Sequence, residues 1–215
     1  MLHVAPRTLL SFSALGVSMT LLAATAVHAQ KAVVPKPEAV DRLVMDGFKS
    51  AAPEWQARLK QDETQKVCSA TRNAPSAAQA AAIRKREKAS IKYPDDGKLT
   101  GDWKKGEALA QSGYGWRYTD YPPRQENGGN CYACHQLDKK ELSYGTLGPS
   151  LAEYGKIRKF KAEEAKEAYA KIFNAQSVQA CSNMPRFGYH KYLTEQQMKD
   201  VTAYLFDPES PVNKP

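Results

Sequence analysis

The amino-acid sequence predicts an all-α protein. Apolar residues recur at helical spacing in several segments, whereas no segment shows the apolar and polar alternation of a half-buried strand. Two helix starts have the form of a capping box, in which Ser76 pairs with Gln79 and Thr194 with Gln197. The 215 residues suffice for one ordinary domain with an extension or for two small domains, and the sequence contains no internal repeat.

Residues 1–29 have the features of an export signal. Arg7 gives a positive charge before an apolar run over residues 9–27, and the small residue Ala29 precedes Gln30. About 20 apolar residues could also span a bilayer as an uncleaved anchor, but serine and threonine side chains interrupt this run. We therefore expect cleavage after Ala29, a periplasmic mature protein, and no membrane span after cleavage.

Residues 30–99 are expected to form a helical extension. The spacing of apolar residues predicts helices over residues 38–49, 53–70 and 76–91, and the last of them ends before a turn at Pro94. The apolar faces of these helices are narrow and rich in alanine. Such faces bury little surface, so we expect the extension to pack on another structure and not to fold by itself.

Residues 100–215 are expected to form the main domain. The same criteria predict helices over residues 102–111, 162–173 and 194–205. Residues 113–130 contain several glycines and prolines, which predict a loop. Its aromatic side chains are expected either to shield a bound group or to contact another subunit. They are Tyr114, Trp116, Tyr118 and Tyr121.

A C-x-x-C-H motif begins at Cys131, includes Cys134 and ends at His135. At this spacing two thiols bond covalently to a haem while the adjacent imidazole binds its iron. A zinc site would need a second pair of ligands at short spacing, whereas Cys68 and Cys181 are single and far apart. A thioredoxin-like dithiol would follow a strand, whereas a loop is expected before this motif. The motif therefore predicts one covalently bound haem c, with the histidine as an axial iron ligand.

Met184 is the expected second axial ligand of the iron. It lies in a proline-containing loop just before the last helix, where the backbone can approach the other face of a haem. Met198 is expected on the core face of that helix and Met45 in the extension, so both are interpreted as packing residues. His190 and an open iron site remain the alternatives. Ligation by histidine and methionine is typical of electron transfer.

Cys68 and Cys181 remain after haem attachment. An oxidising compartment favours a disulfide between them, which would tether the extension beside the Met184 loop. Two alternatives remain open. The two cysteines need not lie within bridging range of each other, and Cys181 could instead be a reactive thiol.

Residues 100–207 resemble a class I cytochrome c. The order of elements is a short helix, C-x-x-C-H, the Gly-Pro-x-Leu sequence of Gly148–Leu151, a helix, a Met-Pro loop and a terminal helix. The resemblance implies a class I cytochrome c domain preceded by the helical extension. It also implies that the carbonyl of Pro149 accepts a hydrogen bond from His135, and that Arg186 approaches a haem propionate.

A combination of motifs is similar to SoxX, the family of monohaem subunits of the SoxAX cytochromes of bacterial thiosulfate oxidation. The motifs are Gly128–His135, Gly145–Leu151, Met184–Gly188 and, upstream, Gln65–Ser69. The resemblance implies an electron-transfer subunit without catalytic residues of its own, in a complex with L-cysteine S-thiosulfotransferase activity. The implied partners are a haem-bearing catalytic SoxA-like subunit in a heterodimer, a sulfur-carrier protein indirectly, and a downstream electron acceptor.

Two other functions fit parts of the sequence. A free-standing cytochrome that shuttles electrons to an oxidase or photosynthetic centre would show the same ligands and charge, but it has little use for the extension. A haem enzyme such as a peroxidase would need an open iron, which Met184 disfavours. The net charge of +8 favours acidic partners or orients redox partners. Nucleic acid is not expected, because the basic residues are dispersed along an exported chain.

Overall fold

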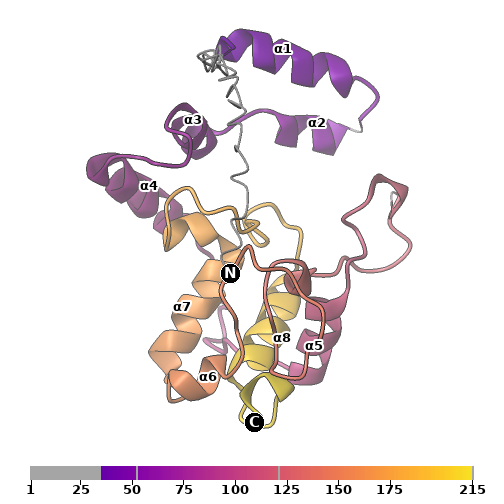
Figure 1. Ribbon diagram of the computed structural model, residues 1–215, viewed down its shortest axis with the longest axis vertical. Helices are drawn as coiled ribbons and strands as arrows, with labels where there is room; N and C mark the ends of the chain where they lie inside the picture. Colours follow the sequence, from indigo (N-terminus) through magenta and orange to yellow (C-terminus); the bar gives the residue numbers. More distant parts are fainter. Residues whose placement is uncertain (1–34, 52, 121, 215) are drawn as a thin grey trace, which may run out of the picture. The chain divides into compact units, whose positions relative to one another are not determined.

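A computed structural model describes residues 35–51, 53–120 and 122–214. It divides the chain into two compact units, one that ends at Ala51 and one that comprises the rest. Within the described residues every regular element is an α-helix or a short 3-10 helix and none is a strand (Figure 1), which confirms the predicted all-α class. The expected export signal, residues 1–29, lies outside the described residues.

The first unit contributes one described helix, α1 (Pro37–Gly47). Pro37 occupies the first helical position, where its fixed φ angle suits a helix and its missing N–H has no partner to lose. α1 buries none of its residues, and Leu43 is 75% exposed. No helix in the described part of the chain is long and apolar enough to cross a membrane.

The second unit begins with three helices, α2 (Pro53–Leu59), α3 (Glu63–Ala70) and α4 (Ala77–Ala89). The sequence predicts one continuous helix where the structure has α2 and α3. The break arises at Asp62, whose side chain accepts a hydrogen bond from the backbone N–H of Gln65 while the Gln65 side chain accepts one from the Asp62 N–H, both at 2.9 Å. This capping box starts a new helix and so ends the preceding one.

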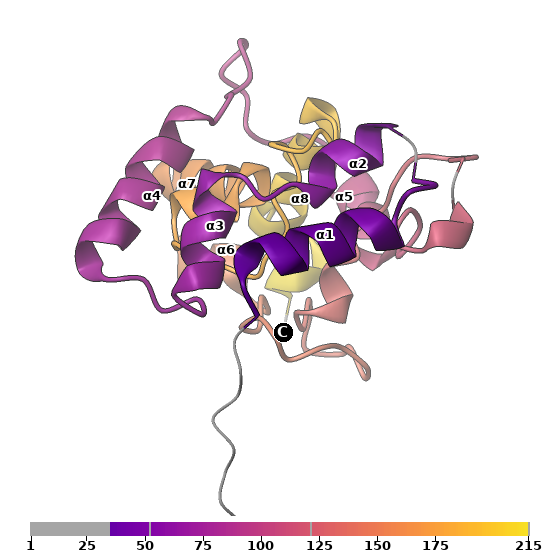
Figure 2. The same cartoon turned by 90° about the horizontal axis from the view of Figure 1, so that it is seen from above.

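α4 begins at the predicted capping box, and its inner face, with Ile83 and Glu87, is buried. It packs against the 3-10 helix η3 (Ala175–Ser177) of the main domain. Figure 2 shows α3 beside α4, and a hydrogen bond from Thr64 Oγ1 to the Glu87 carboxylate joins them. α2 to α4 therefore belong to the same compact unit as the main domain, whereas the sequence predicts a boundary after residue 99.

The core of the second unit lies between α5 (Trp103–Gln111), α7 (Ala162–Phe173) and α8 (Glu195–Phe206). α5 and α8 pack closely, as Figure 1 shows, because Gly106 lets the two backbones approach. A Cβ at this glycine would lie 2.0 Å from the carbonyl oxygen of Asp200. Smaller elements complete the unit: η1 (Tyr118–Asp120), α6 (Tyr154–Ile157) and η4 (Pro211–Asn213).

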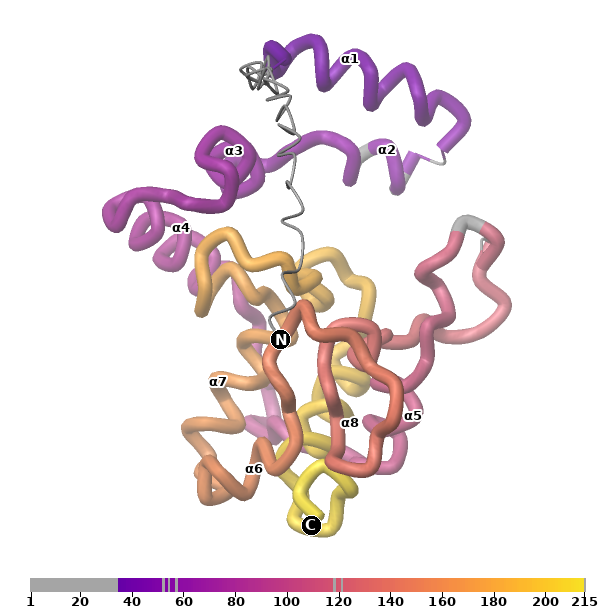
Figure 3. Tube along the Cα trace, in the orientation of Figure 1, coloured from indigo at the N-terminus to yellow at the C-terminus, as the bar shows by residue number. Residues whose placement is uncertain are grey.

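Residues 113–120 and 122–130 form a loop, as predicted, interrupted only by η1, and Tyr121 lies outside the described residues. Part of this loop extends away from the helices in Figure 3. Trp116 fixes part of it, because its Nε1 donates a hydrogen bond to the carbonyl of Gly128 at 2.9 Å. The centroid of its ring lies 6.0 Å from that of Phe187 and 5.0 Å from that of Tyr192. This aromatic side chain therefore packs within its own unit, although it remains 40% exposed.

Candidate haem site

The C-x-x-C-H residues form one tight turn, the 3-10 helix η2 (Cys131–Ala133). The backbone N–H groups of Cys134 and His135 donate to the carbonyl of Cys131, at 3.0 and 2.9 Å. Cys134 follows η2 as its C-cap residue, so both cysteines belong to the same turn. Neither cysteine is in a disulfide, and both sulfur atoms are therefore available for thioether bonds.

The His135 ring is held by the loop that follows the motif. Its Nδ1 lies 2.7 Å from the carbonyl oxygen of Pro149, the contact that the resemblance implied. An Nδ1–H that donates here leaves Nε2 with the lone pair that a metal needs. The ring also packs on Gly148, where an added Cβ would lie 2.1 Å from His135 Cε1. The imidazole is therefore held in one orientation, with Nε2 as the candidate iron ligand.

The segment after the motif carries large apolar side chains that the chain itself does not cover. Leu142, Leu147 and Ile157 are 99%, 87% and 68% exposed. Leu147 adjoins Gly148, so it lies near the His135 ring. Side chains of this kind favour contact with an apolar ligand. A haem attached to the two motif cysteines offers such a surface, and the residues present therefore fit this cofactor.

Met184 is half-buried against the core, in the irregular segment before α8. Met198 is buried in that core, with its Sδ against Gly188, which agrees with its interpretation as a packing residue. Met45 belongs to the first unit. His190 lines the same cavity of about 360 Å³ as Met184, so it stays the alternative ligand. Burial, followed by nearby arginine charges, lowers the pKa of its imidazole and favours the neutral ring.

Cys68 and Cys181 form a disulfide, as expected, with sulfur atoms 2.07 Å apart and Cα atoms 5.3 Å apart. Cys68 lies in α3, and Cys181 precedes Met184 by three residues. Both cysteines are 7% exposed, which disfavours the alternative of a reactive thiol at Cys181. The bridge joins the extension covalently to the loop that carries the candidate ligand.

Arg186 makes contacts within the chain that the sequence did not predict. The guanidinium is buried, and its three nitrogens all bind groups of the chain itself. Nη1 contacts the Asp62 carboxylate, Nη2 lies 2.6 Å from Glu87 Oε2, and Nε donates to Asn174 Oδ1 at 3.2 Å. A buried guanidinium is stable only when its charge is paired. Two carboxylates of the extension provide that pairing, and the contact with a haem propionate stays a prediction.

Glu87 stays ionised in spite of its burial. Burial raises the pKa of its carboxyl, but hydrogen bonds from Thr64 and Asn174 and the charge of a nearby arginine outweigh this effect, so the pKa lies below the ordinary 4.5. The pKa of Asp62 is lowered in the same way, because the hydrogen bond from the Gln65 backbone and the same arginine outweigh the effect of burial. Both carboxylates are therefore charged at neutral pH.

Sequence reasoning missed these partners of Arg186. One signal could have indicated them: Glu87 follows Ile83 by four residues, so a charged side chain occupies the apolar face of α4. Such a position indicates a paired charge. The sequence alone does not identify the partner, because Arg186 lies 99 positions away.

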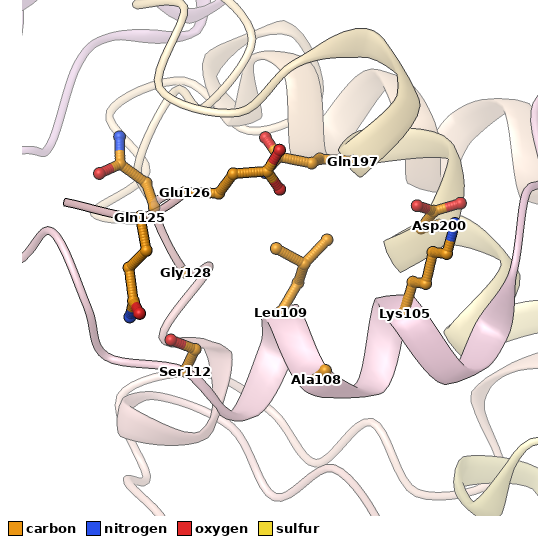
Figure 4. A pocket seen from close by; sticks show the side chains of 10 residues that line it. Lys105, Ala108, Leu109, Ser112, Gln125, Glu126, Gly128, Gln197 and Asp200 are labelled. Carbon is orange, nitrogen blue, oxygen red and sulfur yellow. The ribbon is translucent and has the colours of Figure 1, made fainter. Parts of the chain in front are cut away.

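A second cavity of about 370 Å³ lies between α5, the start of α8 and residues 125–128 (Figure 4). On one side of it Gln197 Nε2 donates to Glu126 Oε2 at 3.0 Å. Neither a motif cysteine nor a candidate iron ligand lines this cavity, so it is not the haem site. Within the described part of the chain no group of three or more His, Cys, Asp or Glu side chains could hold a metal ion, which gives the zinc alternative no support.

The profile of the cytochrome c family matches residues 125–207, which include the C-x-x-C-H turn, Pro149 and Met184. The chain therefore carries a cytochrome c domain, which binds haem c covalently. It is also similar to an uncharacterized lipoprotein of Aquifex aeolicus (strain VF5), with 43% identity over 159 residues, or 74% of this chain and 75% of that protein. That relative is described as uncharacterized, so the likeness assigns no particular role to this chain.

Proposed function

We propose that this protein is the electron-transfer subunit of a SoxAX-like complex, which couples thiosulfate to a cysteine of a carrier protein. Its cytochrome c domain supports electron transfer as the general role. The particular complex is supported by the four sequence motifs that resemble SoxX. The observation that carries the proposal is the Cys68–Cys181 disulfide, because it joins the upstream motif of α3 to the segment that carries Met184. The part of the extension that contains α2 to α4 thus belongs to the cytochrome unit.

Joining thiosulfate to a thiol forms a sulfur–sulfur bond and releases two electrons and one proton. Bound haem supplies a one-electron couple for such a reaction. We assign the two axial positions of the iron to His135 Nε2 and the Met184 thioether, so that no position is left for a substrate. The binding of thiosulfate and the formation of the sulfur–sulfur bond are assigned to the SoxA-like partner, and this chain has no catalytic residue in the proposed role.

The proposed assembly is a heterodimer with the haem-bearing SoxA-like subunit. The carrier protein meets the complex through that subunit, and a downstream acceptor takes the electrons. The net charge of +8 favours an acidic face on the partner or on the acceptor. Complementary charge would orient the two proteins and raise the rate of their association.

An exported location suits both the covalent haem and the disulfide, because the two modifications belong to oxidising compartments outside the cytoplasm. The description of the Aquifex relative as a lipoprotein supports export as well. We propose the periplasm as the location. The sequence has four cysteines, which the haem and the disulfide use, so we propose no lipid-modified cysteine for this chain.

The proposal is tested with haem-loaded full-length protein and the SoxA-like subunit of the same organism. Size-exclusion chromatography of the mixture should show a complex that contains one copy of each chain. Addition of thiosulfate and the carrier protein to the oxidised complex should reduce the haem of this subunit, followed by its absorption spectrum. Carrier protein with its cysteine changed to serine is the matched control and should give no reduction.

The opposite results would assign a different function to this protein. If the chain stays monomeric in the mixture and thiosulfate is oxidised at the same rate without it, this protein is a free-standing electron carrier. In that case its haem spectrum and its axial ligands remain as described, and only the assignment to the complex is lost.

A further inference from the structure

The loop that carries Met184 is anchored on both sides of this residue. Three residues before it, Cys181 is bound covalently to Cys68 of α3. Two residues after it, Arg186 is ion-paired to the extension. Both anchors therefore connect the loop to the same part of the chain, α3 with its N-cap residue and α4.

The ion-paired anchor is buried and geometrically specific. Side-chain exposure is 6% for Arg186 and 4% for Glu87, and Asp62 lies at the edge with 31%. The Arg186 guanidinium also lies 3.6 Å from the centroid of the Tyr189 ring, which limits its rotation. A buried guanidinium that contacts two carboxylates has few alternative positions, because any movement leaves a charge unpaired in an apolar surrounding.

The carboxylates are themselves held by groups outside the loop. Glu87 accepts hydrogen bonds from Thr64 of α3 and, at 2.8 Å, from Asn174 at the end of α7. Asp62 is fixed as the N-cap of α3. The position of Arg186 is thus set by three helices of the unit, and it transmits that position to a ligand two residues away.

We propose that Asp62, Glu87, Arg186 and the Cys68–Cys181 bridge form a clasp that positions Met184 for the haem iron. The inference rests on Met184 as the sixth ligand and does not depend on the partner complex. The residues of the clasp touch neither the iron nor a substrate, so they are positioning residues. They act because a ligand in a pre-ordered loop binds without the entropy loss of ordering that loop.

The experiment measures carbon monoxide binding to the reduced, haem-loaded full-length protein. Carbon monoxide and Met184 compete for one iron position, so the apparent affinity for carbon monoxide rises in proportion to the loss of methionine binding. Glu87→Gln keeps the shape of the side chain and removes its charge. We expect it to raise the apparent carbon monoxide affinity on the order of tenfold, because Arg186 loses its more buried partner.

Two further variants keep the test decisive. Asp62→Asn changes the less buried partner, folds more readily, and should act in the same direction with a smaller effect. A Glu87→Gln and Arg186→Gln double variant should raise the affinity by less than the product of the two single effects, because both changes break the same interaction. The matched control is Lys199→Gln, which breaks the 3.1 Å ion pair between Lys199 and Asp96 and should leave the affinity unchanged.

The outcomes separate the clasp from the ligand assignment. Suppose that Met184→Ala binds carbon monoxide more tightly than wild type, whereas Glu87→Gln and Asp62→Asn bind it with the wild-type affinity. The clasp then does not position Met184, and Met184 remains the assigned iron ligand. The clasp is equally wrong if these variants lose free energy of unfolding without any change in carbon monoxide affinity, because the ion pairs then only stabilise the fold. If Met184→Ala itself changes nothing, the ligand assignment fails and the clasp fails with it.

Discussion

The two faces of the haem site are built in opposite ways. On the His135 side every group that holds the ligand comes from residues 131–149, namely the motif turn, Gly148 and the carbonyl of Pro149. On the Met184 side the supporting groups are distant in sequence. Cys68 lies 113 positions from Cys181 and Glu87 lies 99 from Arg186.

This difference indicates which of the two proposed ligands depends on the rest of the fold. The histidine needs a short segment with local hydrogen bonds, so a change elsewhere should leave it in place. The methionine depends on long-range contacts, whose loop-closure entropy is offset only when the whole unit has folded. We therefore expect the Met184 side to be the more easily perturbed of the two.

The largest expected effect is on the Met184 side. Met184→Ala removes the only methionine in the loop before α8 and should leave an open or water-filled iron site. The reduced variant should bind carbon monoxide at every haem, whereas wild type should bind little. Met198→Leu is the control, because Met198 is buried in the core. Equal binding by wild type and Met184→Ala, with unchanged spectra, would contradict the assignment.

The matching change on the His135 side is Gly148→Ala. The added Cβ would lie 2.1 Å from Cε1 of the ring, so the imidazole must move. We expect a lower yield of haem-loaded protein and a loss of about 1–3 kcal/mol in the free energy of unfolding. Both are measured on purified protein, by the ratio of haem to chain and by urea unfolding. Gly47→Ala, where a Cβ meets nothing within 4 Å, is the control, and a wild-type result for Gly148→Ala would show that the ring is not held there.

Removal of the disulfide tests the covalent part of the Met184 side. For a loop of this length the chain-entropy model gives about 4–5 kcal/mol, so Cys68→Ser with Cys181→Ser should lower the free energy of unfolding by that order. Urea unfolding of haem-loaded protein measures it, and the exposed Ala70→Ser is the control. A loss below about 1 kcal/mol would mean that the bridge constrains the unfolded chain little.

The smallest effect expected is a dependence on pH. The pKa values of Glu87 and Asp62 lie below their ordinary 4.5 and 3.8 in the folded protein, so the unfolded chain binds more protons in acid. Their contribution to the free energy of unfolding is fully present above the pKa values of the unfolded chain. It is lost as the pH falls from those values toward the lower pKa values of the folded protein. Urea unfolding between roughly pH 3 and pH 7 should show stability falling below about pH 5, with a shallower fall in Glu87→Gln. Parallel curves for the two proteins would exclude this contribution of Glu87.

The same contrast explains what the sequence predicts well. The all-α class, the capping boxes at Ser76 and Thr194 and the haem-binding motif depend on neighbouring residues, so their patterns are visible in the chain. The disulfide could be predicted because only two cysteines remain after haem attachment. The ion-pair partners of Arg186 were not predicted, because they come from helices that no local pattern places beside it.

The boundaries of the helices and of the main domain were also predicted less well than the helical class. The predicted helix over 53–70 is broken by the capping box at Asp62, a local signal that the apolar spacing does not reveal. The expected boundary after residue 99 follows from narrow apolar faces, which indicate packing on another structure. In the structure that partner is the main domain of the same unit, and burial of Glu87 and Cys68 against it could not be read from their own segment.

We infer that His135 and Met184 bind the iron of the oxidised protein, and near-infrared magnetic circular dichroism tests this most directly. The charge-transfer band in that region distinguishes histidine–methionine from bis-histidine and from histidine–water ligation. We expect a single histidine–methionine band for wild type, and the same band in a His190→Ala variant. A bis-histidine band that disappears in His190→Ala would assign the sixth position to His190 and would contradict the account.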